Sequence, residues 1–96
     1  MQIQLSPQRR NDTLTVSKQG DTLTINGIAY DFSAVTEGAT LPASATDCEF
    51  ITGNIERIAG MLHLTLLLPH GADPSQAVCF PVPFINPANG LLKLPQ

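Results

Sequence analysis

The chain has 96 residues, of which 43% are hydrophobic and 14% charged, and five basic against eight acidic side chains give a net charge of −3. This composition predicts one globular domain over residues 1–96 and argues against a disordered chain. Only Arg9 and Arg10 are adjacent basic residues, so we expect no nucleic-acid-binding surface. The sequence has no apolar run of about 18 residues and no signal-peptide pattern, which predicts no membrane span and synthesis in the cytoplasm.

The first twelve residues alternate only weakly between apolar and polar side chains. Ile3 and Leu5 would share one side, so residues 1–5 are predicted to form a short edge strand. Residues 6–12, SPQRRND, are polar and contain a proline, and we expect a loop there.

Clean alternation over residues 13–32 predicts a three-stranded antiparallel meander. Its first connection, residues 18–21, has the length of a four-residue hairpin loop, which would place Val16 opposite Leu23. The second is Asn26-Gly27, the dipeptide that best tolerates the positive φ angles of a two-residue type I′ turn. Both turns predict one buried face, made of Leu14, Val16, Leu23, Ile25, Ile28, Tyr30 and Phe32.

The most apolar segment is MLHLTLLL, residues 61–68, which follows a polar loop over residues 33–47 and a strand candidate over residues 48–58. Its length, and the Pro69 and Gly71 that end it, favour a strand over a helix. Its even-numbered leucines would share one buried face. The tight turn Ala59-Gly60 would connect it to the preceding strand.

This hairpin has a definite predicted register. It places Glu56 opposite His63 and Ile55 opposite Leu64, with a bend at Gly53-Asn54. It also places Arg57 on the leucine face near an open end, where its aliphatic stem could cover apolar surface.

Residues 77–85, AVCFPVPFI, are apolar but contain Pro81 and Pro83, which cannot donate in a β-ladder. This segment is therefore predicted to be an edge strand or an extended wrap over the core. Taken together, the elements predict an all-β domain: a small antiparallel sandwich of meanders and hairpins, or a partly open barrel, with long Pro- and Gly-containing loops.

The residues that could carry chemistry are few and poorly spaced. Structural zinc sites generally use closely spaced ligand pairs, which His63, His70, Cys48 and Cys79 do not form, so we predict no metal and no cofactor. Cys79 and His70 flank one loop with Asp73 between them, but no catalytic signature surrounds them. Without a secretion signal, both cysteines are predicted to be reduced and to fill the core.

Two long stretches carry a resemblance. SPQRRNDTLTVSKQGDTLTING (residues 6–27) and ERIAGMLHLTLLLPHG (residues 56–71), with GATLP at residues 38–42, resemble short proteins encoded in bacterial prophages among the tail genes of double-stranded DNA phages. The resemblance extends to about Phe80. These proteins carry no known activity, so no functional residue is transferred, and Ala59 departs from their usual Asp-Gly turn. The resemblance implies a phage-derived, tail-associated protein in the host cytoplasm or in the virion.

Two functional hypotheses follow. The first is a non-enzymatic structural or assembly module that binds another phage tail or assembly protein, with Phe80, Phe84 and His70 as candidate contacts and a homo-oligomer left open. The alternative is a small prophage-encoded enzyme or enzyme-modulating binder with a site near His70 and Asp73. The first requires an exposed apolar patch or an open strand edge. The second requires a pocket with converging polar groups.

Overall fold

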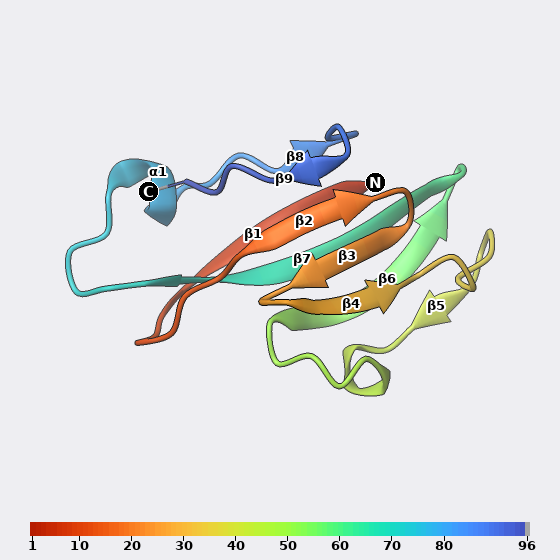
Figure 1. Ribbon diagram of the computed structural model, residues 1–96, viewed down its shortest axis with the longest axis horizontal. Coiled ribbons are helices and arrows are strands. Elements are labelled where there is room, and N and C mark those ends of the chain that lie inside the picture. The colour runs from red at the N-terminus through yellow and green to blue at the C-terminus, as the bar shows by residue number, and fades with distance from the viewer. Residues whose placement is uncertain (96) are drawn as a thin grey trace.

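The computed structural model describes residues 1–95 and consists of two β-sheets packed face to face, so the predicted all-β class is confirmed (Figure 1). In spatial order, one sheet contains β5 (Thr40–Leu41), β6 (Ile51–Ile58), β7 (Met61–His70), β1 (Gln2–Arg9) and β8 (Phe84–Ile85). The other contains β4 (Ile28–Asp31), β3 (Thr22–Ile25), β2 (Val16–Gln19) and β9 (Gly90–Leu91). The sheets form a sandwich and do not close into a barrel. The 3₁₀ turn η1 (Ala43–Ala45) and the short helix α1 (Gln76–Cys79) lie in connections.

A single apolar core lies between the sheets. The even-numbered leucines of β7, residues 62 to 68, are all buried, as the alternation predicts. Each contributes about 1.5–3 kcal/mol by burial. Leu62, Leu64 and Leu66 form one cluster with Ile3 and Ile55 from their own sheet and with Val16, Leu23 and Ile25 from the other. Among residues 1–95 no polar or charged side chain is buried.

Strand β1 differs most from its prediction. It is an interior strand of eight residues that pairs in parallel with β7, from Gln2 opposite His63 to Arg9 opposite His70. The predicted edge strand is therefore wrong, and the predicted loop over residues 6–12 is wrong for residues 6–9, whereas residues 10–12 lie outside any strand as predicted. Arg10 donates to the His70 carbonyl at 3.1 Å, so Pro7, three residues earlier, faces the opposite edge of β1. No strand pairs with that edge beyond Ile3, and the missing proline N–H is tolerated there.

The meander forms with one correct turn and one shifted turn. Asn26 and Gly27 have φ values of 50° and 85°, and Leu23 lies opposite Tyr30 as predicted. The first turn consists of two residues instead of four, so Val16 lies opposite Ile25 and not Leu23. A shift of two residues keeps the same face inward, which explains why these side chains are nevertheless buried.

Ile28 is a correction to the predicted buried face. Its side chain is 58% exposed, whereas Leu14 and Tyr30 are half-buried. It begins β4, the outer strand of its sheet, where no further strand covers it. The Asn26 side chain also accepts from Thr15 N–H at 2.7 Å and donates to the Thr13 carbonyl at 3.0 Å. These two bonds fix the backbone of residues 13–15, which precede β2, although these residues are not part of the β2–β3 ladder.

The β6–β7 hairpin has the predicted turn at Ala59-Gly60, and Glu56 lies opposite His63. Between the pairs at Thr52 and Glu56, three residues of β6 oppose the single residue Leu64, so β6 bulges. Ile55 therefore does not pair with Leu64 as predicted but lies opposite Leu41 of β5. The bulge contains Gly53, whose φ of +74° suits a glycine.

Arg57 lies on the leucine face, as predicted, and closes one end of the sandwich. Its guanidinium donates to the Val35 carbonyl at 2.5 Å, to the Asp21 carboxylate at 3.0 Å and to the Gly60 carbonyl at 3.4 Å. The side chain is only 16% exposed. It thereby joins β6 to the β2–β3 turn in the other sheet and to the connection after β4.

Part of the predicted extended segment over residues 77–85 is helical. Ser75 caps α1 by accepting from Val78 N–H at 3.3 Å, and Val78 is buried against the fold. The prediction is thus wrong for residues 77–79. In residues 1–95 there is no helix with the length and apolar character needed to cross a membrane.

Candidate functional site

Residues 76–95, which we call the C-terminal arm, run along one side of the sandwich (Figure 1). After α1 the arm passes the first sheet, where β8 pairs with the start of β1. It then turns and returns along the second sheet, where β9 pairs with β2. Asn89 fixes the turn by accepting from Lys18 Nζ at 3.1 Å and from Gly20 N–H at 3.0 Å. The arm closes this side of the core with very little regular structure.

Exposed apolar side chains are concentrated in this arm. Among residues 1–95, six large hydrophobic side chains are at least half exposed, and four belong to the arm. These are Phe80 (76%), Val82 (80%), Ile85 (62%) and Leu91 (73%). Single exposed apolar residues are ordinary on a protein surface, whereas a concentration of them marks an interaction surface.

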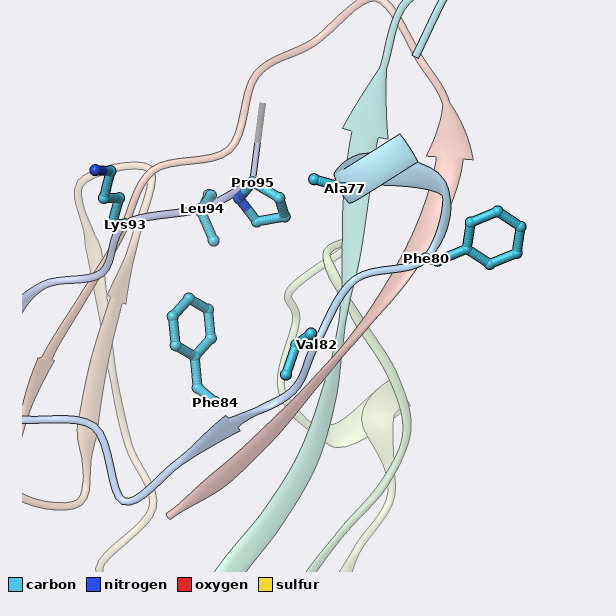
Figure 2. A pocket seen from close by; sticks show the side chains of 7 residues that line it. All are labelled: Ala77, Phe80, Val82, Phe84, Lys93, Leu94 and Pro95. Atoms are coloured by element: carbon cyan, nitrogen blue, oxygen red, sulfur yellow. The ribbon is translucent and has the colours of Figure 1, made fainter. Parts of the chain in front are cut away.

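An open apolar hollow of about 390 Å³, which we call the arm hollow, lies between the outgoing and returning parts of the arm (Figure 2). Its lining residues are Ala77, Phe80, Val82, Phe84, Lys93, Leu94 and Pro95. In Figure 2 the Phe84 ring points toward Leu94, and the Phe80 ring points away from the other lining side chains. One phenylalanine thus forms part of the hollow's wall and the other projects from its rim.

The two phenylalanines therefore differ in surroundings. Phe84 is half-buried, packs against the core and lies opposite Ile3, which confirms the predicted edge position of this part of the segment. Phe80 follows α1 and its ring lies mainly in solvent. Their role as partner contacts stays a prediction.

The outer edge of β8 is poorly suited to strand addition. Asn86 donates to the Met1 carbonyl at 2.9 Å, so the backbone of Pro83, Ile85 and Pro87 faces the other way, out of the sheet. Two of these three residues lack an N–H group. Such prolines protect an edge against unwanted pairing. A partner would therefore contact this part of the arm through side chains.

His70 lies at the end of β7 beside a different open hollow of about 460 Å³. Its Nδ1 is 2.8 Å from the Gly71 carbonyl, and because a carbonyl only accepts, Nδ1 carries the proton. Arg10 and Asp12 also line this hollow, and hydrogen bonding to Asp12 raises the pKa of Arg10. Asp73 does not line the hollow, so the structure does not bring the two residues of the alternative site together there.

The two cysteines occupy different environments. Cys48 is buried in the core, as predicted, whereas Cys79 is exposed, so the prediction that both fill the core is wrong for Cys79. Both are free thiols. Burial and a hydrogen bond with Cys48 raise the pKa of the Tyr30 hydroxyl, and the hydrogen bond is the larger cause. Within residues 1–95 no three His, Cys, Asp or Glu side chains are placed to hold a metal ion together.

No family model, no curated protein and no solved structure matches this chain. The resemblance to prophage tail-region proteins therefore stays a prediction. Sequence reasoning identified the segment that contains Phe80, Phe84 and Ile85 but missed Leu91 and Leu94 as neighbours in the same arm. The sequence signal for these leucines was the short apolar stretch after residue 90. No strand lies within this stretch with which it could form a hairpin.

Proposed function

We propose that the protein is a non-enzymatic structural or assembly module of a prophage, associated with the tail, that binds another tail or assembly protein through its C-terminal arm. The observation that carries the proposal is the concentration of exposed apolar side chains in the arm. The prophage context is supported only by the sequence resemblance.

The geometry of the arm supports a contact made by side chains. The Phe80 ring provides a large apolar surface that loses little side-chain entropy when it is buried, and aromatic residues are enriched in interface cores. The arm hollow offers an apolar recess for a side chain of the partner. Pro83 and Pro87 restrict backbone pairing there, which favours this mode over strand addition.

Purified phage particles and assembly intermediates from an induced host provide the test. We expect the protein to be found by mass spectrometry with the particle or with a tail assembly intermediate, and the double variant Phe80→Ser/Val82→Ser to be lost from it. Ile58→Ser is the matched control, because Ile58 is 50% exposed on β6, outside the arm. Absence of the unaltered protein from both fractions would refute the phage assignment. Equal retention of the double variant would refute the arm as the contact surface.

A site near His70 is the second candidate, for a small enzyme or enzyme-modulating binder. It is supported by the size of the hollow beside His70 and by the polar groups of Arg10 and Asp12 at its wall. Arg10 is engaged by Asp12 at 2.6 Å and by Glu49 at 3.2 Å, so its charge is largely neutralised. We therefore favour the binding module. If the purified protein showed an enzymatic or enzyme-modulating activity that His70→Ala abolished, while this variant still associated with the particle, the second candidate would replace the binding module.

A further inference from the structure

The outer strands of the two sheets differ in how much unpaired backbone they present. β5, β8 and β9 have two residues each, and the outward row of β8 is interrupted by prolines. β4 has four residues and no proline. Among the outer strands in residues 1–95, β4 therefore has the longest proline-free edge.

The backbone groups of β4 that face outward belong to Ala29 and Asp31. Phe32 donates to the Asp21 carbonyl at 2.9 Å on the β3 side, and alternate residues of a strand direct their N–H and C=O groups to opposite edges. Within residues 1–95 neither Ala29 nor Asp31 has a backbone hydrogen-bonding partner on this outward side. Both residues are exposed. Two donors and two acceptors are thus available to an added strand.

An open hollow of about 270 Å³ lies beside this edge. Ile28 and Tyr30 contribute its wall from β4, and Cys48 and Phe50 contribute from the connection before β6. Ile28 is largely exposed there, although its side chain is on the same side of β4 as Tyr30. A strand added to β4 would extend its own inward-facing side chains into this apolar space.

The surroundings of this edge are acidic. Asp31 lies on β4, and the exposed Asp47 and Glu49 line the hollow. The Ser33 N–H donates to Asp31 at 2.9 Å and lowers the pKa of that carboxyl, so Asp31 is ionised at neutral pH. Asp31 lies on the face of β4 opposite the hollow, and on the hollow side Arg10 is 3.2 Å from Glu49. A second copy of the chain would bring the same carboxylates together, which opposes pairing of β4 with itself.

We propose that β4 pairs with an extended segment of a partner protein in which basic and apolar residues alternate. Apolar side chains of the segment face the hollow beside Ile28 and Tyr30, and basic side chains share the opposite face with Asp31. The segment bonds to Ala29 and Asp31 through its backbone, which supplies affinity, while the alternation supplies specificity. This surface goes beyond the proposed function, because β4 and β9 are opposite outer strands of the second sheet.

The test uses isotope-labelled full-length protein and a short peptide in which lysine alternates with valine. We expect NMR shift changes confined to residues 28–31 and to the hollow, with binding weakened as salt increases. A peptide of alternating glutamate and valine tests the charge. A lysine–valine peptide whose N–H groups facing β4 are methylated tests the backbone hydrogen bonds. We expect the glutamate–valine peptide and the methylated peptide each to bind at least about tenfold more weakly than the unmodified lysine–valine peptide.

Protein variants complete the test. Ala29→Pro removes an outward donor and should abolish binding of the lysine–valine peptide. Asp31→Asn, which keeps a side-chain acceptor for the Ser33 N–H, should weaken it, and Asp73→Asn is the control for an exposed acid elsewhere. No binding of the lysine–valine peptide, or shift changes away from β4, would overturn the proposal. Self-association of the unliganded protein through β4, detected by ultracentrifugation and lost in Ala29→Pro, would overturn it in favour of a second copy.

Discussion

Arg57 illustrates how one side chain can hold the two sheets together at their open end. The ion pair with Asp21 is 42% exposed on the aspartate side, and such pairs contribute about 0–1 kcal/mol. The bond to the Val35 carbonyl lies in a less exposed position, and hydrogen bonds to charged groups contribute about 1.5–3 kcal/mol. The carbonyl bond therefore provides more of the stabilisation than the ion pair does.

Replacing Arg57 with methionine should lower the free energy of unfolding by about 1.5–3 kcal/mol, because the Val35 carbonyl loses its donor while the aliphatic stem is preserved. Asp21→Asn should cost less than about 1 kcal/mol. Urea denaturation of both variants measures the difference, with Arg9→Ala as the control for an exposed arginine. Equal costs for the two variants would contradict this division of the energy.

At the scale of elements, β8 shows how a two-residue strand can be both an edge and a cover for the core. Its Phe84 packs inward against the core, while Ile85 is exposed on the outward side. The alternation of a strand produces this division even over two residues. The same short strand therefore contributes to stability through one side chain and to the exposed arm surface through the other.

Phe84→Ala should destabilise the protein, by less than the roughly 3–5 kcal/mol of a fully buried phenylalanine, because Phe84 is half-buried. Phe80→Ala should change the free energy of unfolding by no more than about 0.5 kcal/mol, because its ring lies in solvent. Thermal unfolding followed by calorimetry distinguishes them. A larger cost for Phe80 than for Phe84 would show that the arm packs differently in solution.

The elements that sequence reasoning placed well are those specified by local signals. Asn26-Gly27 and Ala59-Gly60 each determine a tight turn, and the leucine alternation determines the buried face of β7. The bulge in β6 could be located at Gly53 but its size could not, because several registers preserve the same buried face. The site was predictable only as an apolar, proline-containing segment. Which side chains of this segment are exposed depends on how many residues of the arm pair with β1 and β2.

At the scale of the whole molecule, the parallel pairing of β1 with β7 joins two strands that are far apart in the sequence, residues 2–9 and residues 63–70. Neither strand contains a local signal for the other, and parallel strands need a long connection between them. Here that connection includes the entire meander in the other sheet. Non-local pairing of this kind explains why the first strand was misassigned as an edge.

A chain lacking residues 1–9 should not fold, because β7 would lose its eight-residue partner strand and the core would lose Ile3. Adding residues 1–9 as a peptide should restore the fold by occupying the empty position between β7 and β8. NMR amide dispersion measures this, and it suits a protein without tryptophan. The same peptide with Ile3→Ala is the control and should restore the fold poorly. A well-dispersed spectrum for the truncated chain alone would contradict the prediction.

The β1–β7 pairing also sets an order of events during synthesis. Gln2 cannot pair until His63 has been synthesised. At a translation rate of roughly 5–20 residues per second, this takes roughly 3–12 s after Gln2 is made. The nascent chain can form the meander and then the β6–β7 hairpin from neighbouring residues. Strand β1 is therefore made before the other strands described here and is expected to be among the last of them to dock. Until then its apolar residues are available to chaperones or to another nascent chain.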